Sequence, residues 1–141
     1  MNIYFACSIT GGREFEPVYQ AIVEAMLFDG HSVPTAYLAE TSVKELEQVV
    51  APEDVYARDV AWIQAADVLV AEVSTPSHGV GYEIGFALAL GKPVLACYRS
   101  DRIISKMISG NRDANLLVEN YQFPGEAVML VRRFLSSRKK E

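Results

Sequence analysis

Glu83 is the only charged side chain between Gly79 and Gly91. The stretch IGFALAL that follows it predicts a helix buried on all sides, with one face on a sheet and the other on a second subunit. Near the start of such a helix the dipole favours the ionised carboxylate, and Tyr82 in the same turn would help to orient it. We therefore weigh two roles for this glutamate, a helix cap and a nucleophile.

Asp59 provides a second carboxylate, in the stretch VYARDVAWIQAAD. On a helix it shares the apolar face with Trp62 and Ile63, whereas Arg58 would lie on the solvated face. Asp59 would then point inward, either to cap a neighbouring loop or to work beside Glu83. Two carboxylates about 5 Å apart suit cleavage of a glycosidic bond, because one attacks the anomeric carbon while the other assists the leaving group.

Two glycine-containing loops could hold a ligand. The loop TPSHGVG places Ser77 and the amide of Gly79 at a helix N-terminus, which is a ready anion site. In SITGGRE, Ser8 follows an apolar run, Gly12 allows close approach of the backbone, and Arg13 can reach a phosphate or a base edge. The alternative for this loop is an ordinary turn with an exposed arginine. The glycine spacing matches neither a dinucleotide fingerprint nor a Walker A loop.

The composition of the 141-residue chain predicts one domain over residues 1–136 and a solvated tail at 137–141. A formal net charge of −5 argues against a nucleic-acid partner, although a few local donors can still hold one phosphate. No apolar run is long enough for a membrane span. A strand predicted within two residues of Met1 leaves no room for a signal peptide, so we expect a cytoplasmic protein.

Cysteines and histidines give no sign of metal or disulfide chemistry. Cys7 and Cys97 lie in apolar, strand-like runs and are expected to be buried free thiols. His31 and His78 have no partners at ligand spacing, so no metal site is expected.

Strands and helices are predicted to alternate along the chain, which indicates a parallel sheet between two layers of helices. We expect a flavodoxin-like, Rossmann-like α/β three-layer sandwich with a five-stranded sheet in the order 2-1-3-4-5. Ligands bind such sheets at the switch point, here between the first and third strands, where the loops of Ser8 and Ser77 follow. The expected strands are 2–9, 29–35, 67–73, 92–99 and 115–119, and the expected helices are 15–28, 41–50, 52–66, 79–90, 102–109 and 124–135.

The motifs YF-x-x-SI-x-GGRE and AEV-x-x-PS-x-GVGYE-x-G together resemble the 2′-deoxynucleoside 5′-monophosphate N-glycosidases of the nucleoside 2-deoxyribosyltransferase superfamily. The similarity extends in order over roughly two-thirds of the chain. It implies that Glu83 is the nucleophile and that Asp59 assists departure of the base. It also implies that the apolar helix forms a dimer interface.

The same resemblance implies the substrate contacts. The 5′-phosphate would be held by Ser77, Gly79 and, across a homodimer interface, Ser105. Tyr4, Ser8 and Ile9 would line the sugar and base pocket. The chain departs from some members at Thr10, where they carry arginine, and at Tyr56 and Ala57, where they carry a His-Glu pair. These positions bear on base preference.

The expected function is therefore hydrolysis of a (deoxy)nucleoside 5′-monophosphate to a free base and a sugar 5-phosphate. The reaction would pass through a glycosyl ester on Glu83 and need no metal or organic cofactor. One alternative is a nucleoside 2-deoxyribosyltransferase, which passes the sugar to a second base. Another is a nucleotide-binding sensor without turnover, although a pure binder has no use for two inward carboxylates.

Overall fold

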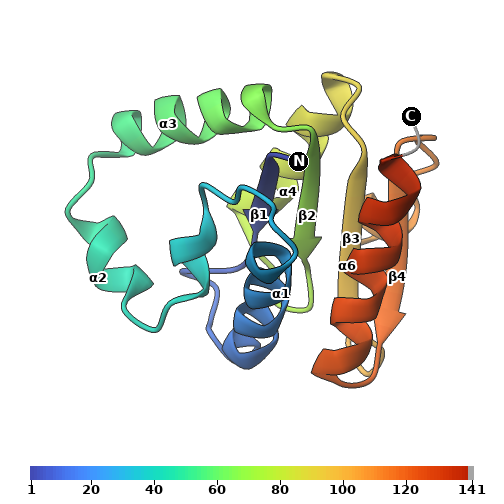
Figure 1. Ribbon diagram of the computed structural model, residues 1–141. Coiled ribbons are helices and arrows are strands. Elements are labelled where there is room, and N and C mark those ends of the chain that lie inside the picture. The colour runs from blue at the N-terminus through green and yellow to red at the C-terminus, as the bar shows by residue number, and fades with distance from the viewer. Residues whose placement is uncertain (140–141) are drawn as a thin grey trace.

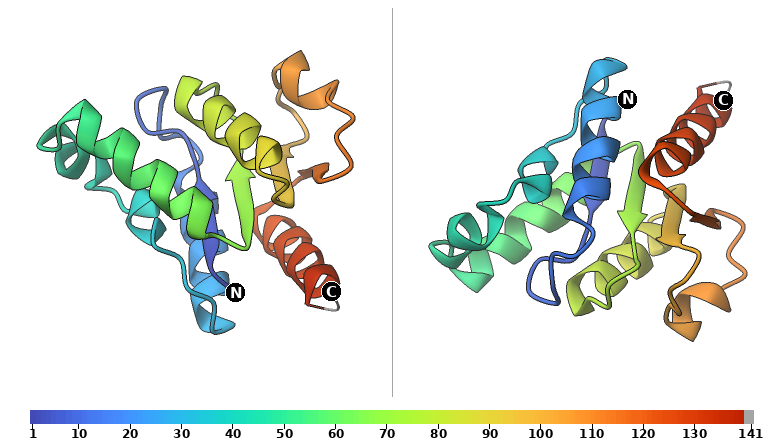
Figure 2. Two further views of the ribbon diagram at one scale, coloured as in Figure 1. Left: turned by 90° about the horizontal axis from the view of Figure 1, so that it is seen from above. Right: turned by 90° about the horizontal axis from the view of Figure 1, so that it is seen from below.

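The computed structural model describes residues 1–139 as a helix–sheet–helix sandwich (Figure 1). A parallel sheet in the order β1-β2-β3-β4 forms the middle layer. Two helices, α1 and α6, cover one face, and α3 and α4 cover the other (Figure 2). The strands are β1 (Ile3–Ala6), β2 (Val68–Glu72), β3 (Val94–Arg99) and β4 (Leu116–Tyr121); the helices are α1 (Glu16–Phe28), η1 (Ala36–Ala39), α2 (Val43–Gln48), α3 (Pro52–Ala65), α4 (His78–Ala89), α5 (Lys106–Ser109) and α6 (Pro124–Arg138).

Every residue of the first two strands is buried because both faces of the sheet are covered, and all of them except Glu72 are aliphatic or aromatic. Successive side chains alternate between the two cores. Phe5 and Val70 belong to the core beneath α1 and α6, whereas Tyr4 and Leu69 belong to the core beneath α3 and α4. The alternation therefore aims Tyr4 at the two helices that carry the candidate carboxylates.

The expectation of five strands in the order 2-1-3-4-5 is wrong. Residues 29–35 lie beside β1 but are joined to the sheet by a single isolated bridge at Ser32. The next positions cannot extend the ladder, since Pro34 has no N–H to donate. The side chain of Thr35 takes over, and its Oγ1 accepts a hydrogen bond from the backbone N–H of Phe5 at 2.8 Å.

The loops after β1 and β2 meet at the carboxyl edge of the sheet. The chain leaves β1 toward α1 on one face and leaves β2 toward α4 on the other, so these strand ends diverge as at a switch point. A Cβ added to Gly11 would overlap the carbonyl oxygen of Pro76 and lie 2.9 Å from Ser8 Oγ. The two loops are thus in backbone contact, and α4, which carries Glu83, begins directly after the second of them.

The remaining expectations concern single residues and the chain end. Cys7 and Cys97 are buried free thiols, as expected. The last helix reaches Arg138, so the expected tail at 137–141 begins inside α6, and residues 140–141 of it lie outside the described residues. No helix within residues 1–139 is both long enough and apolar enough to cross a membrane.

Candidate active site

Glu83 is bound by a tyrosine from the sheet. Tyr4 is buried on β1, and its hydroxyl donates a hydrogen bond to Oε2 of Glu83. Helix α4 begins at His78, because Ser77 caps it by accepting a hydrogen bond from the N–H of Val80 at 3.3 Å. Glu83 is therefore in the second turn of α4, beyond the first turn in which a side chain can cap a helix.

Burial controls the ionisation of Glu83. Removal from water raises its pKa to about 7, and the Asp59 carboxylate adds to the rise. The hydrogen bond from Tyr4 and the charge of Arg58 act in the opposite direction. Burial and the charge of Asp59 thus outweigh the two groups that favour the ionised form. Near neutral pH the protonated and ionised forms coexist.

Asp59 and Glu83 line one cavity of about 220 Å³ between α3 and α4. Asp59 is partly buried, as its position on the apolar face predicts, and burial raises its pKa. The Nε of Arg58 opposes this shift by donating to Asp59 Oδ1 at 2.9 Å. The other residues of the wall are mostly apolar: Val55, Tyr56, Val60, Ile63, Gly79 and Tyr82.

Tyr82 does not orient Glu83, and this expectation is also wrong. Its side chain is 56% exposed, and its hydroxyl lies 3.4 Å from that of Tyr56. Its ring stacks on Phe86 with the ring centroids 6.2 Å apart. Tyr82 lines the same cavity as Glu83, but among the described residues no hydrogen bond joins the two side chains. The orienting group comes instead from β1.

In the loop after β1, neither Ser8 nor Ile9 lines the cavity of Asp59 and Glu83. Ser8 is fully buried, and among the described residues its hydroxyl has no hydrogen-bond partner. Ile9 packs against the core beneath α1. Gly12 has a φ of 129°, which only glycine adopts without strain, and a Cβ there would contact Thr75 at 3.7 Å. The loop is thus shaped against the β2–α4 loop.

Arg13 has its donors engaged within the chain. Its Nε donates to Glu16, its Nη1 to the carbonyl oxygen of Ser8, and its Nη2 to the carbonyl oxygen of Glu40, each at 3.0 Å. Its guanidinium also lies over the ring of Tyr19. This arginine fastens the first loop to the segment before α2.

The residues predicted to bind phosphate lie on two sides of the start of α4. Gly79 lines the cavity of Glu83. Ser77 lines a second cavity of about 520 Å³, and Ser105 of the same chain lines it too. Ser105 is exposed and caps α5, accepting a hydrogen bond from the N–H of Met107 at 3.2 Å. One chain alone thus gathers both serines around one cavity.

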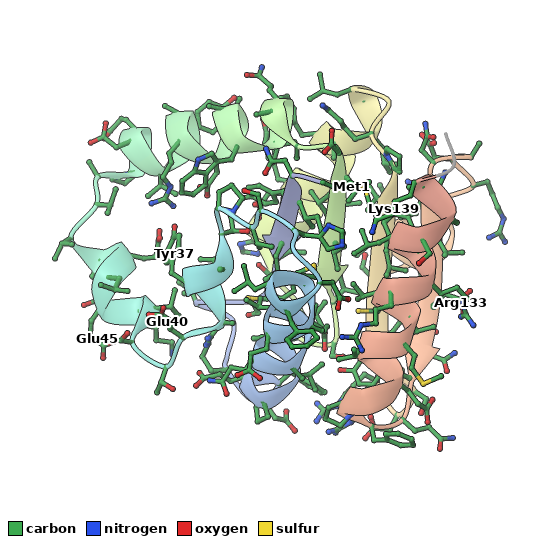
Figure 3. All side chains as sticks on the ribbon, viewed as in Figure 1. Met1, Tyr37, Glu40, Glu45, Arg133 and Lys139 are labelled. Carbon is green, nitrogen blue, oxygen red and sulfur yellow. The ribbon has the colours of Figure 1, made fainter. Side chains whose placement is uncertain are left out.

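Two charged residues of this region were not predicted as parts of it. Arg58 is not on the solvated face but lies over the rings of Tyr37 and Trp62. Tyr37 occupies the space between η1, α2 and α3 (Figure 3). Glu72, the last residue of β2, is fully buried. Trp62, four residues after Arg58 on the same helix, is the sequence signal that could have placed Arg58 in this region.

Within residues 1–139, no group of three or more His, Cys, Asp or Glu side chains is gathered as metal ligands would be. The groups gathered at the site are two carboxylates, a tyrosine hydroxyl and the backbone at Gly79. A pair of carboxylates in a largely apolar cavity can divide the roles of nucleophile and acid–base group, because their surroundings shift their pKa values differently.

Comparison with known proteins places the chain in a family. The family model described as nucleoside 2-deoxyribosyltransferase matches residues 3–127. The 5-hydroxymethyl-dUMP N-hydrolase of Mus musculus is 43% identical over 118 residues, which cover 81% of this chain and 68% of that protein. The Homo sapiens protein of the same name is 38% identical over 140 residues, with 96% and 79% covered. This chain therefore belongs to the nucleoside 2-deoxyribosyltransferase family.

The fold is shared with a solved structure of lower sequence identity. The CMP N-glycosidase of Clostridium botulinum matches with a TM-score of 0.71 at 18% identity, over 94% of this chain and 98% of that one. The match confirms the three-layer α/β architecture expected from the alternating pattern.

Proposed function

We propose that this chain hydrolyses the N-glycosidic bond of 2′-deoxynucleoside 5′-monophosphates, yielding a free base and 2-deoxyribose 5-phosphate. The names of the mouse and human relatives support this reaction class. The observation that carries the proposal is the pair of carboxylates, Glu83 and Asp59, facing one cavity while Tyr4 binds only one oxygen of Glu83.

In the proposed first step Glu83 acts as the nucleophile. The hydroxyl of Tyr4 binds Oε2, and Oε1 lies 3.8 Å from where a Cβ on Gly79 would be. Glycine at position 79 thus keeps the front of Oε1 open. Oε1 attacks C1′, the bond to the base breaks, and its electron pair leaves with the base, which takes a proton from the carboxyl group of Asp59.

In the second step water releases the sugar. Asp59, now a carboxylate, takes a proton from a water molecule, whose oxygen attacks C1′. The ester bond to Glu83 breaks, and its electron pair returns to the Glu83 carboxylate. Both carboxyl groups are then restored, so no cofactor is consumed in the cycle.

The amide of Gly79 and the N-terminal dipole of α4 would hold the 5′-phosphate together with Ser77. The buried hydroxyl of Ser8, without a partner among residues 1–139, would bind the sugar. Replacing Ser77 with alanine should raise KM for monophosphates about tenfold, the usual effect of one lost hydrogen bond to a charged group, and leave nucleosides almost unaffected. Equal effects on both substrates would contradict the phosphate role.

A homodimer is the second part of the proposal. The outer face of α4 is exposed in the single chain and carries small and apolar residues, Gly81, Gly85, Ala89 and Leu90 among them. Ile103 and Met107 across the larger cavity are 96% and 83% exposed. A second copy would cover this surface and could bring its Ser105 to the phosphate. Phe86→Glu, with the exposed Ala89→Glu as the variant that cannot disturb the core, should yield monomers in light scattering.

Mixing two impaired variants separates the two possible sources of Ser105. If Ser105 acts across the interface, a heterodimer of Glu83→Gln and Ser105→Ala chains contains one intact site, and activity recovers. If Ser105 serves its own chain, every site in the mixture has one defect and activity does not recover. The second outcome would be in line with the shared cavity of Ser77 and Ser105 within one chain.

The function itself is tested by base release. The purified protein is incubated with deoxynucleoside and ribonucleoside 5′-monophosphates, 5-hydroxymethyl-dUMP included, and with the matching nucleosides, and free base is followed by chromatography. Release from deoxynucleoside monophosphates alone is the expected result. Exchange that requires an added acceptor base would instead identify a deoxyribosyltransferase.

A further inference from the structure

Arg58 is held on three sides next to the candidate active site. Its guanidinium carbon lies 5.0 Å from the ring centre of Trp62 and 5.6 Å from that of Tyr37. Its Nη2 donates to both carboxylate oxygens of Glu47 on α2, at 3.2 and 3.3 Å. Its Nε donates to Oδ1 of Asp59 at 2.9 Å. One side chain therefore connects α2, η1 and α3 to a carboxylate of the cavity.

This geometry does not follow from the helix alone. Arg58 and Asp59 are consecutive residues of α3, and consecutive side chains on a helix do not face each other. The arginine reaches Asp59 because its long side chain folds back across the two rings, where cation–π attraction holds it. Glu47 fixes the other edge of the guanidinium. Tyr37 in turn donates to Glu47 Oε1 at 2.7 Å, which fixes the anchor itself.

We propose that Arg58 is a positioning residue for Asp59: the arginine, anchored by Glu47, occupies Oδ1 and thereby presents Oδ2 to the base and to water. This inference rests on the roles proposed above for Asp59 and Glu83. Helix α2 contributes no residue to the lining of the Glu83 cavity. Through Glu47 it would nevertheless help to fix the position of Asp59.

The charges around Asp59 give the inference a measurable sign. The groups that face it are Tyr4 on β1, Arg58 on its own helix, Glu47 on α2 and Glu83 on α4, with Tyr37 of η1 behind the guanidinium. Burial raises the pKa of Asp59, and Arg58 lowers it. Arg58 lowers the pKa of Glu83 as well. Its removal should therefore raise both pKa values and shift the acid limb of activity to higher pH.

The experiment compares kcat and KM across pH 5 to 9 for Arg58→Gln, Arg58→Lys, Glu47→Gln and the matched control Arg132→Gln. Arg132 also binds a carboxylate through two hydrogen bonds, to Asp29 at 2.8 and 3.1 Å, but joins α6 to the end of α1. It therefore reports the loss of an arginine–carboxylate pair elsewhere in the chain.

For Arg58→Gln we expect kcat to fall about tenfold at pH 6 and less at pH 8, with KM almost unchanged, which corresponds to an acid limb raised by up to about one pH unit. Glu47→Gln should shift the limb in the same direction by less, because the charge remains but its anchor is weakened. Arg58→Lys keeps the positive charge but loses the planar set of N–H donors that binds Glu47 and Asp59 together. Its acid limb should therefore lie at the pH of the unaltered protein, whereas its kcat at high pH should stay lower. Arg132→Gln should match the unaltered protein.

A pH profile of Arg58→Gln that is unshifted, with kcat normal or lowered equally at every pH, would overturn the inference and leave Arg58 a packing residue. Glu83→Gln, assayed alongside, distinguishes the two levels of failure. If it is inactive while Arg58→Gln has a normal profile, only the role of Arg58 fails. If Glu83→Gln remains active, the proposed chemistry fails first.

Discussion

Glu72 and Glu83 are two acidic residues near the carboxyl edge of the same sheet, in very different surroundings. Glu72 is fully buried and accepts three hydrogen bonds, from the hydroxyl of Tyr121 at 2.6 Å, the N–H of Ser74 at 2.5 Å and the hydroxyl of Ser74 at 3.1 Å. Glu83 accepts one, from Tyr4. A carboxylate with both oxygens engaged holds structure, whereas one with a free oxygen remains available for chemistry.

The bonds of Glu72 show what it holds. They connect the end of β2 to β4 through Tyr121 and to the following loop through Ser74. The Ser74 hydroxyl also accepts from the N–H of Arg99 at 2.8 Å, which adds β3 to the network. The loop that leads to Ser77 and α4 thus starts from a fixed point. Glu72 supports the site without facing its cavity.

The largest effect should come from Glu83→Gln. Loss of the nucleophile should lower turnover by at least about 10³-fold, because the amide of glutamine cannot form the ester with C1′. Base release and circular dichroism at pH 7.5 measure activity and fold together. The outcome that contradicts the comparison is a folded variant with near-normal activity.

The same variant should be more stable than the unaltered protein at high pH. The pKa of Glu83 is raised in the folded state, from 4.5 to about 7, so the folded chain binds more protons and loses stability as pH rises between these values. Glutamine cannot ionise, so Glu83→Gln should gain up to about 3 kcal/mol at pH 8 and almost nothing near pH 4.5. Urea unfolding at both pH values measures the difference in the free energy of unfolding. Equal gains in stability at the two pH values would contradict an ionisation of Glu83 in the folded chain.

Glu72→Gln should have the converse effect. An amide places an NH₂ group where the carboxylate accepted from Ser74 or Tyr121, so the free energy of unfolding should fall by about 1–3 kcal/mol. Turnover per folded molecule should change less than threefold. Thermal unfolding and base release on the same sample check both statements. A strong loss of turnover without a loss of stability would place Glu72 in the chemistry.

The smallest effects sharpen the comparison through a matched pair of hydroxyl deletions. The hydrogen bond from Tyr4 lowers the pKa of Glu83, so its removal in Tyr4→Phe should raise that pKa. The acid limb of kcat should then move upward by about half to one pH unit. Tyr121→Phe removes one of three hydrogen bonds of Glu72 and should cost about 1 kcal/mol of stability with an unchanged pH profile. Identical pH profiles for the two variants would contradict the comparison.

Local pattern predicted most of the fold. The alternation of strands and helices predicted the four strands, and the continuous apolar run of β1 is typical of a strand covered on both faces. The failure at residues 29–35 has a local cause, since Pro34 removes a donor and a threonine side chain replaces the ladder. The pattern did not predict that the Thr35 hydroxyl would replace a backbone acceptor for the N–H of Phe5 and so keep the segment beside β1.

The site was predicted less completely, because its decisive contacts join residues far apart in the chain. The pattern on α3 placed Asp59 inward, and the lone charge in an apolar helix singled out Glu83. Tyr4 was assigned to the pocket only through the family resemblance, and its contact with Glu83 depends on the register of β1 against β2. Arg58 was assigned to the solvated face because helix periodicity takes no account of a side chain that folds back.

The contact of Gly11 with Pro76 has a consequence for engineering the substrate range. Because the carbonyl of Pro76 leaves no room for a side chain at position 11, the contact between the two loops does not accept a larger residue there without moving the backbone. The wall contributed by α3 has no such restriction, since Val55 and Tyr56 line the cavity from the surface of a helix. A library that seeks new bases should therefore vary α3 and leave both loops unchanged.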